Sequence, residues 1–265
     1  MPEPAAPATP ADWGIEFRGV SFGYGGPAVL RDLSFTAPAG RMTAIVGPSG
    51  SGKTTITRLI ARFYDPEAGS VLIGGVPLPE LGTAVVEQAV APVFQDVYLF
   101  DDTILNNVWI GNPDLDRDQV IAAATRARVD EIADRLPGGW EARVGEGGSN
   151  LSGGERQRIS IARALLKDAR IVLLDEATAA LDIGNEIAIG QAVDAIRADR
   201  TLIVVAHRLQ TIMTADQIIM LDGDGGIRET GSHAELLAAD GDYARYWRER
   251  VDAVGWQLAG HHPSS

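Results

Sequence analysis

The sequence predicts an α/β fold in which helices cover both faces of a mostly parallel sheet. One observation is that short apolar runs, of the kind that form buried strands, alternate with segments of helical periodicity. A second is a glycine-rich loop, Gly47 to Thr55, that joins an apolar run to a helical segment. A third is the run Ile171 to Leu174, which ends in the acidic pair Asp175-Glu176. Strands interleaved with helices in this way favour a parallel sheet with its ligand site at one edge.

The N-terminal part is expected to hold an arm, an antiparallel β subdomain and the first strands of the parallel sheet. Residues 1–12 are rich in Pro and Ala and lack the basic start and apolar centre of a signal peptide, so we expect a disordered arm or linker. Alternating apolar residues from Ile15 to Tyr24 predict a strand, and the slip at Arg18-Gly19 predicts a bulge. Further strands are expected at 29–37, 42–46, 71–73 and 91–94, and a helix at 83–90.

From about residue 97 to 165 the pattern is helical and poor in strands, which predicts an inserted α-helical subdomain. Its helices include 119–126 and 155–166. Strand and helix then alternate again, and one domain is expected to span 13–250, followed by a C-terminal tail at 251–265. The later elements are strands at 171–174 and 202–206, a hairpin of 217–221 and 227–229, and helices at 185–198, 234–237 and 243–251.

The composition excludes several classes of function. The formal net charge of −13 over 265 residues argues against general nucleic-acid binding, which needs a basic footprint. The absence of cysteine rules out disulfides and thiolate chemistry. No apolar run approaches the roughly 20 residues that cross a bilayer.

The glycine-rich loop has the spacing of a phosphate-binding motif, G-x-x-x-x-G-K-[ST]. Its glycines let the backbone bring amides onto phosphate oxygens, and the following helix directs its positive end at the same charge. We expect Lys53 to reach the β- and γ-phosphates and the Thr54 hydroxyl to bind Mg²⁺. A loop that merely turns the chain is the alternative, which the position between strand and helix opposes. The predicted contacts are Gly47, Pro48, Ser49, Gly50, Ser51, Gly52, Lys53, Thr54 and Thr55.

The pair Asp175-Glu176 lies where a parallel strand delivers side chains to a ligand. Asp175 would hold Mg²⁺, directly or through water, and Glu176 would polarise a water for attack on the γ-phosphorus. The alternative is an acidic strand end that faces solvent. The phosphate-binding loop in the same chain makes that alternative the weaker one.

A third motif, Leu151-Ser152-Gly153-Gly154-Glu155, begins a helix. Ser152 and Glu155 form a capping box, which accounts for both residues structurally. The capping box leaves Gly153 and Gly154 unexplained, because glycine in a helix costs about 1 kcal/mol against alanine. Glycines there let an anion approach the helix start, and the phosphate bound by a second copy of the protein is the natural anion.

These motifs, in this order, make the chain similar to an ATP-binding cassette (ABC) ATPase from about residue 15 to 250. The resemblance implies a P-loop NTPase (RecA-like) fold, ATP and Mg²⁺. Tyr24 would stack on adenine, Gln95 would contact Mg²⁺ and the attacking water, and His207 would contact the γ-phosphate. Asp182 would lie in a loop that crosses the dimer interface. The catalytic set so implied is Glu176, His207, Gln95 and Lys53.

Further motifs resemble the exporter-type subgroup of this family. They are Gly145-Glu146-Gly147-Gly148 before the helix start, Thr103-Ile104-Leu105-Asn106-Asn107, and Ala206-His207-Arg208-Leu209. Ala179 and Asp101-Asp102 depart from the family pattern without touching the catalytic set. The stretch Tyr243 to Trp256 is similar to exporter-fold siderophore importers of actinobacteria and enterobacteria, and a packing helix with an aromatic anchor explains it equally well.

The resemblance implies the ATP-hydrolysing domain of an exporter-fold transporter, at the cytoplasmic face of the membrane. Its partners would be a second ATPase domain, paired head to tail, and a transmembrane domain, but no nucleic acid. The stretch from Gln95 to about Val108 would transmit movement to membrane helices. Three alternatives stay open: a stand-alone importer ATPase, a DNA-maintenance ATPase and a non-hydrolysing ATP-binding regulator. The substrate and the direction of transport stay open too.

Overall fold

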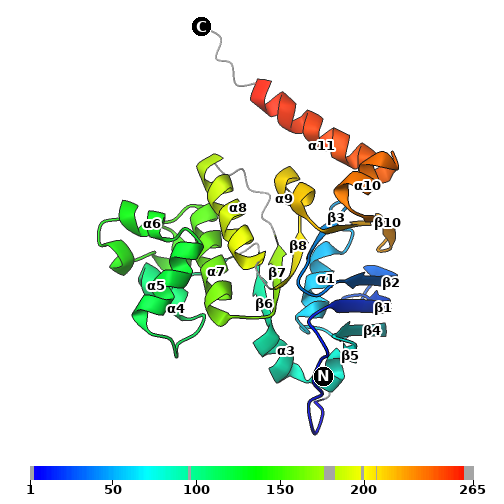
Figure 1. The fold of residues 1–265 in the computed structure, drawn as a ribbon, viewed down its shortest axis with the longest axis horizontal. Helices are drawn as coiled ribbons and strands as arrows, with labels where there is room; N and C mark the ends of the chain where they lie inside the picture. Colours follow the sequence, from blue (N-terminus) through cyan, green and yellow to red (C-terminus); the bar gives the residue numbers. More distant parts are fainter. Residues whose placement is uncertain (1–2, 95–96, 176–182, 198–199, 207, 260–265) are drawn as a thin grey trace.

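The computed structural model describes residues 3–94, 97–175, 183–197, 200–206 and 208–259. Two sheets and an α-helical subdomain make up the molecule (Figure 1). The strands are β1 (Ile15–Phe22), β2 (Leu30–Ala37), β3 (Met42–Val46), β4 (Ala68–Ile73), β5 (Val76–Pro77), β6 (Val90–Val93), β7 (Ile171–Asp175), β8 (Thr201–Val205), β9 (Gln217–Leu221) and β10 (Ile227–Gly231). The helices are α1 (Lys53–Ile60), α2 (Leu78–Leu81), α3 (Thr83–Ala89), α4 (Ile104–Trp109), α5 (Arg117–Arg126), α6 (Asp130–Arg135), α7 (Gly153–Lys167), α8 (Ile183–Arg197), α9 (Leu209–Thr214), α10 (His233–Ala238) and α11 (Asp242–Ala259).

The main sheet has the strand order β10-β9-β3-β8-β7-β6, and only β10 runs antiparallel to its neighbour. Successive side chains of β3 enter two different cores. Met42, Ala44 and Val46 belong to one hydrophobic cluster, and Ile45 belongs to the other. Both faces of the sheet are therefore covered, as a parallel sheet requires. The predicted α/β class is confirmed.

A smaller antiparallel sheet, β2-β1-β4-β5, covers one side of the main sheet. In β1, the pairing with β2 shifts register between Phe17 and Val20, which places the predicted bulge at Arg18-Gly19. The ring of Phe17 stacks on that of Phe35, 4.6 Å between centroids, and ties β1 to β2. The predicted antiparallel subdomain is thus confirmed, with its irregular strand.

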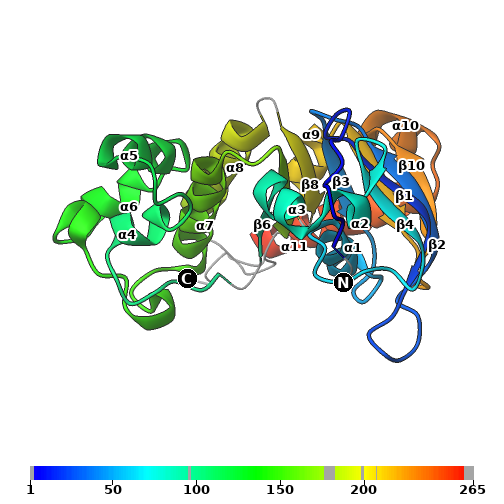
Figure 2. The same cartoon turned by 90° about the horizontal axis from the view of Figure 1, so that it is seen from below.

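The helical subdomain runs from α4 to α7 and lies to the left of the sheets in Figure 2, with α1 on the right. Helix α7 is long enough to reach both parts, because it packs on α4, α5 and β6. None of the helices within the described residues is long and apolar enough to cross a membrane.

The two chain ends differ from the sequence-based expectations. Residues 3–12 lack regular secondary structure, but Glu3 accepts hydrogen bonds from the Thr83 amide, at 2.9 Å, and from Arg62 Nη1, at 3.3 Å. A buried arginine thus holds the arm that we expected to be disordered. At the other end, α11 continues to Ala259, past the tail boundary predicted at 251. Four short helices, α2, α4, α6 and α9, escaped prediction because each is too short to show a helical period.

Candidate functional site

The glycine-rich loop joins β3 to α1, as its motif predicts. Gly50 and Gly52 have φ of 81° and 95°, in the region that favours glycine. A Cβ on Gly52 would lie 2.5 Å from Leu30 Cδ2, so the loop also needs glycine for its close approach to β2. Gly52 immediately precedes α1, which directs the helix start into the loop.

Lys53 is almost fully buried, with 7% of its surface exposed, yet it carries the only side-chain ammonium of the loop. Its Nζ donates to the carbonyl oxygens of Gly47, at 3.1 Å, and Pro48, at 2.6 Å. Burial lowers the pKa of Lys53, the positive charge of Arg250 lowers it further, and Asp175 opposes both. The ammonium is thus held by carbonyl oxygens where a phosphate is predicted to bind.

Thr54 and Asp175 lie 121 positions apart in the sequence and meet at the carboxyl ends of β3 and β7. The Thr54 hydroxyl donates to Asp175 Oδ2 at 2.9 Å, and Asp175 is 6% exposed. A hydroxyl beside a buried carboxylate is a pair of hard oxygen ligands, which suits Mg²⁺ completed by phosphate oxygens and water. The residues therefore fit the predicted ion.

Tyr24 lies at the outer side of the loop, with 46% of its surface exposed. The rings of Phe22 and Tyr64 contact it edge-on, with centroids 5.0 and 5.2 Å away. Its hydroxyl lies 3.2 Å from Thr55 Oγ1 and accepts from Arg58 Nη1 at 3.3 Å. The ring is thus held in place beside α1 while nearly half of it stays open to a planar ligand.

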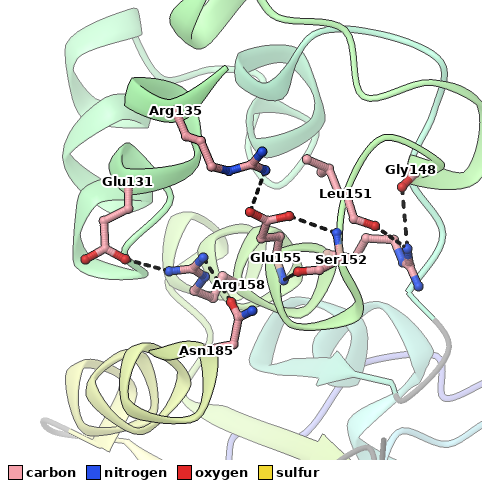
Figure 3. Close-up of polar contacts among 9 residues, drawn as sticks. Glu131, Arg135, Gly148, Leu151, Ser152, Glu155, Arg158 and Asn185 are labelled. Carbon is pink, nitrogen blue, oxygen red and sulfur yellow. Dashed lines mark hydrogen bonds and ion pairs between the residues drawn. The ribbon is translucent and has the colours of Figure 1, made fainter. Parts of the chain in front are cut away.

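The helix start at α7 has the predicted capping box (Figure 3). The Ser152 amide donates to Glu155 Oε2 at 2.8 Å, and Arg135 donates to Glu155 Oε1 at 2.7 Å. Burial would raise the pKa of Glu155, but the hydrogen bonds from Ser152 and Arg135 outweigh burial and hold that pKa below its usual value. The carboxylate therefore stays charged and locks the start of the helix.

The two glycines of this motif have different surroundings. A Cβ on Gly154 would come within 3.0 Å of Asn185 Cβ, on the neighbouring helix α8. Asn185 is held there by Arg158, whose Nη2 donates to its Oδ1 at 3.2 Å (Figure 3). Gly154 thus has a packing reason that the sequence did not reveal. Within the described residues, the surroundings of Gly153 differ: beyond its own helix backbone and chain neighbours, the nearest atom to a Cβ placed on Gly153 is Arg156 Nη2, at 3.9 Å, which leaves room for an anion.

A groove of about 450 Å³ lies between the sheet and the helical subdomain. Ile110, 51% exposed, and Tyr98 supply its apolar rim, while Arg163 and Lys167 supply positive charge. Arg163 Nε donates to Asn107 O at 2.6 Å and Nη1 to Tyr98 O at 3.0 Å, so carbonyl oxygens position its guanidinium. Burial lowers the pKa of both Arg163 and Lys167.

Four predicted site residues, Gln95, Glu176, Asp182 and His207, lie outside the described residues, and their roles stay predictions. Sequence reasoning did not single out Arg58, whose Nη1 donates to the hydroxyl of Tyr24 at 3.3 Å.

Comparisons with known proteins show which family the chain is similar to. The family model for ABC transporter matches residues 30–179. The chain is 50% identical to the mycobactin import ATP-binding/permease protein IrtB of Mycolicibacterium smegmatis, over 96% of the chain and 45% of that protein. It is 46% identical to the ATP-dependent lipid A-core flippase of Haemophilus influenzae, over 91% of the chain and 41% of that protein.

Among solved structures, a bacterial Atm1-family ABC exporter with ATP bound superposes with a TM-score of 0.88 at 44% identity. The match covers 94% of the chain and 44% of the exporter. The chain therefore spans less than half the length of these relatives. The predicted resemblance is confirmed, including its exporter-type character.

Proposed function

Because this chain belongs to the ABC transporter family, we propose that it binds and hydrolyses ATP to power transport across a membrane. The observation that carries the proposal is the meeting of Lys53, Thr54 and Asp175 around one loop, where the ammonium, the hydroxyl and the carboxylate have complementary roles. One relative is named an ATP-dependent flippase, and this name supports the use of ATP to drive transport.

Different residues of the chain have different roles in ATP binding and hydrolysis. Lys53 is released from its carbonyl partners to bind the phosphates, and α1 adds the positive end of its dipole. Thr54 and Asp175 would hold Mg²⁺, which would supply positive charge against the phosphates of the nucleotide. Glu176 follows Asp175 in sequence and is assigned the role of orienting the attacking water and accepting its proton, with Gln95 and His207 assisting.

We propose further that two copies of this domain, or this domain and an unlike one, close on two ATP molecules. The helix start at Ser152 belongs to the helical subdomain, whereas the loop of the same chain is already completed by α1 (Figure 2). Open space beside Gly153 supports an anion supplied by another chain. Asp182 would cross the same interface.

The partner of the groove is proposed to be a short helix of the transmembrane domain. The relatives named as ATP-binding/permease proteins extend beyond the matched segment, which supports a membrane part in the complete protein. Exposed Ile110 and Tyr98 offer it an apolar seat, and Arg163 and Lys167 favour a carboxylate or carbonyl on the docking helix. This docking would place the domain at the cytoplasmic face of the membrane.

The test combines hydrolysis with assembly. Wild-type chain should release phosphate from Mg-ATP, and Lys53→Ala should lose ATP binding, because no neighbouring ammonium replaces its charge. Glu176→Gln should retain ATP and form a dimer in size-exclusion chromatography with light scattering, run with and without Mg-ATP. Adding Ser152→Arg should restore the monomer by blocking the phosphate contact, while ATP still binds.

Two outcomes would contradict the proposal. Wild-type turnover by Glu176→Gln would remove the role given to that carboxylate, and unchanged ATP affinity in Lys53→Ala would remove the phosphate site itself. If Glu176→Gln stays monomeric alone, the experiment is repeated with any second ABC ATPase domain that is encoded beside it. A chain that stays monomeric both alone and in that mixture contradicts the dimer.

A further inference from the structure

Arg158, in the second turn of α7, joins two helices that belong to different parts of the molecule. Its Nη1 donates to Glu131 Oε2 on α6 at 2.7 Å, and its Nη2 donates to Asn185 Oδ1 on α8 at 3.2 Å (Figure 3). Helix α6 belongs to the helical subdomain, whereas α8 lies between β7 and β8 of the main sheet in the chain. One guanidinium thus bridges the helical subdomain and the sheet domain.

The geometry of this bridge depends on the shape of the guanidinium. The Arg158 side chain is only 6% exposed, so it is enclosed between its two partners. Its N–H groups form a rigid planar fork, and a separate arm of the fork serves each partner. The bridge therefore sets the position of α6 relative to α8, which a single ammonium could not do, because one nitrogen on a flexible stem has no such fork.

A second ion pair holds the first turn of α7 on the same helix α6. Arg135, one turn after Glu131, donates to Glu155 Oε1 at 2.7 Å, and Glu155 lies one turn before Arg158 (Figure 3). The two pairs have opposite polarity, since α6 supplies the acid in one and the base in the other. A shift of α7 by one turn along α6 would bring like charges together, so the two pairs fix the register of the helix start.

Asn185 passes this restraint on to the glycines of the helix start. A Cβ on Gly154 would lie 3.0 Å from Asn185 Cβ and 3.2 Å from its Oδ1, the atom to which Arg158 donates. The start of α7 therefore lies directly against an amide that Arg158 orients. Helix α8 begins at Ile183, so this contact is made in the first turn of α8. The starts of α7 and α8 are thus held together as one unit.

We propose that Arg158 is a positioning residue for the contact between two such domains. By bridging Glu131 and Asn185, it holds the start of α7 in the orientation in which the open position at Gly153 meets ATP bound to the other chain. This inference rests on the proposed closure of two domains on ATP. The guanidinium is enclosed between α6 and α8, so it acts through the helix start and changes dimer formation without changing ATP binding by the single chain.

The experiment compares Arg158→Lys with Arg126→Lys, both in the Glu176→Gln background, with the second ABC ATPase domain added if the dimer requires it. Arg126 Nη2 donates to the carbonyl oxygen of Ala195 at 2.8 Å, so it also ties the helical subdomain to α8, but at the other end of that helix. Light scattering over a series of protein concentrations with Mg-ATP gives the dimer Kd. We expect Arg158→Lys to raise this Kd about tenfold, because one charged hydrogen bond between helices is lost. Arg126→Lys should leave it unchanged.

Further variants approach the bridge from its two partners. Asn185→Leu keeps the branched shape and removes the acceptor, so it should raise the dimer Kd as Arg158→Lys does, and the double variant should add little, because both changes break one contact. Glu131→Gln weakens the bridge from its half-exposed end and should raise the dimer Kd in the same direction. Urea unfolding checks that each variant is folded, and titration at protein concentrations below the dimer Kd should give one ATP affinity for all of them.

A dimer Kd in Arg158→Lys equal to that in Arg126→Lys would overturn the inference, because the place of the bridge at the helix start would then have no effect of its own. Weaker ATP binding by monomeric Arg158→Lys or Asn185→Leu would overturn it too, since the bridge would then act on the nucleotide site of its own chain. The Glu176→Gln parent separates the two levels of the argument. If the parent dimerises and Arg158→Lys dimerises equally well, only this inference fails; if the parent never dimerises, the proposed closure fails and this inference with it.

Discussion

Replacing Tyr24 with alanine should weaken ATP binding more than it destabilises the fold. Truncating a buried Phe or Trp to alanine costs about 3–5 kcal/mol. Because 46% of Tyr24 is exposed, about half of that, roughly 2 kcal/mol, is the expected loss in free energy of unfolding. Stacking of a base on one aromatic ring is worth about 1–3 kcal/mol, so Kd for ATP should rise about 5-fold to 150-fold.

Two variants serve as controls for this experiment. Tyr24→Phe keeps the ring and loses the hydroxyl contacts to Thr55 and Arg58, so its ATP affinity should stay near wild type. Tyr64→Ala removes a ring of similar exposure from the same aromatic cluster, so it should match Tyr24→Ala in stability but not in ATP binding. Urea unfolding gives the stabilities, and titration with ATP gives the affinities.

The reasoning is refuted if Tyr24→Ala and Tyr64→Ala raise Kd equally, because the effect would then come from loosening the cluster. It is refuted equally if Tyr24→Ala loses stability while ATP affinity is unchanged, since Tyr24 would then be a packing residue of the β subdomain.

Two further predictions concern the groove and the start of α7. Ile110→Asp should leave ATP hydrolysis by the separate chain unchanged, because Ile110 is half exposed, but it should abolish co-purification with the transmembrane partner. Met213→Asp, at a similarly exposed site on α9, should leave co-purification intact. Co-purification retained in Ile110→Asp would exclude the groove as the docking site. Glu155→Gln should cost about 1–3 kcal/mol of stability near neutral pH, by loss of charged hydrogen bonds to Ser152 and Arg135. The native pKa of Glu155 lies below the usual value of a glutamate, so this contribution is present above that usual value and is lost as pH falls through the native pKa. The difference in stability between wild type and Glu155→Gln in urea unfolding should therefore shrink in acid, and a difference independent of pH would contradict the reasoning.

Local patterns alone determined the class of the fold and most of its elements. Alternation predicted β1 with its bulge, four apolar residues predicted β7, and a capping box predicted the start of α7. These features are visible in sequence because each depends on residues within one or two turns of chain. The motif spacing also predicted that Thr54 and Asp175 belong to one site, and the structure brings the hydroxyl of Thr54 within 2.9 Å of the Asp175 carboxylate.

Contacts between distant segments decided the rest. The glycine at 154 is required because Asn185, 31 positions later, lies against it, and no local rule connects the two. Likewise, Arg62 holds the N-terminal arm through Glu3, although composition alone predicts disorder there. The start of α11 is held on β10, where Glu229 accepts from the amide of Asp242, 13 positions later in the sequence. In each case the deciding term is a steric or electrostatic contact made only when the chain is folded, which no pattern of neighbouring residues records.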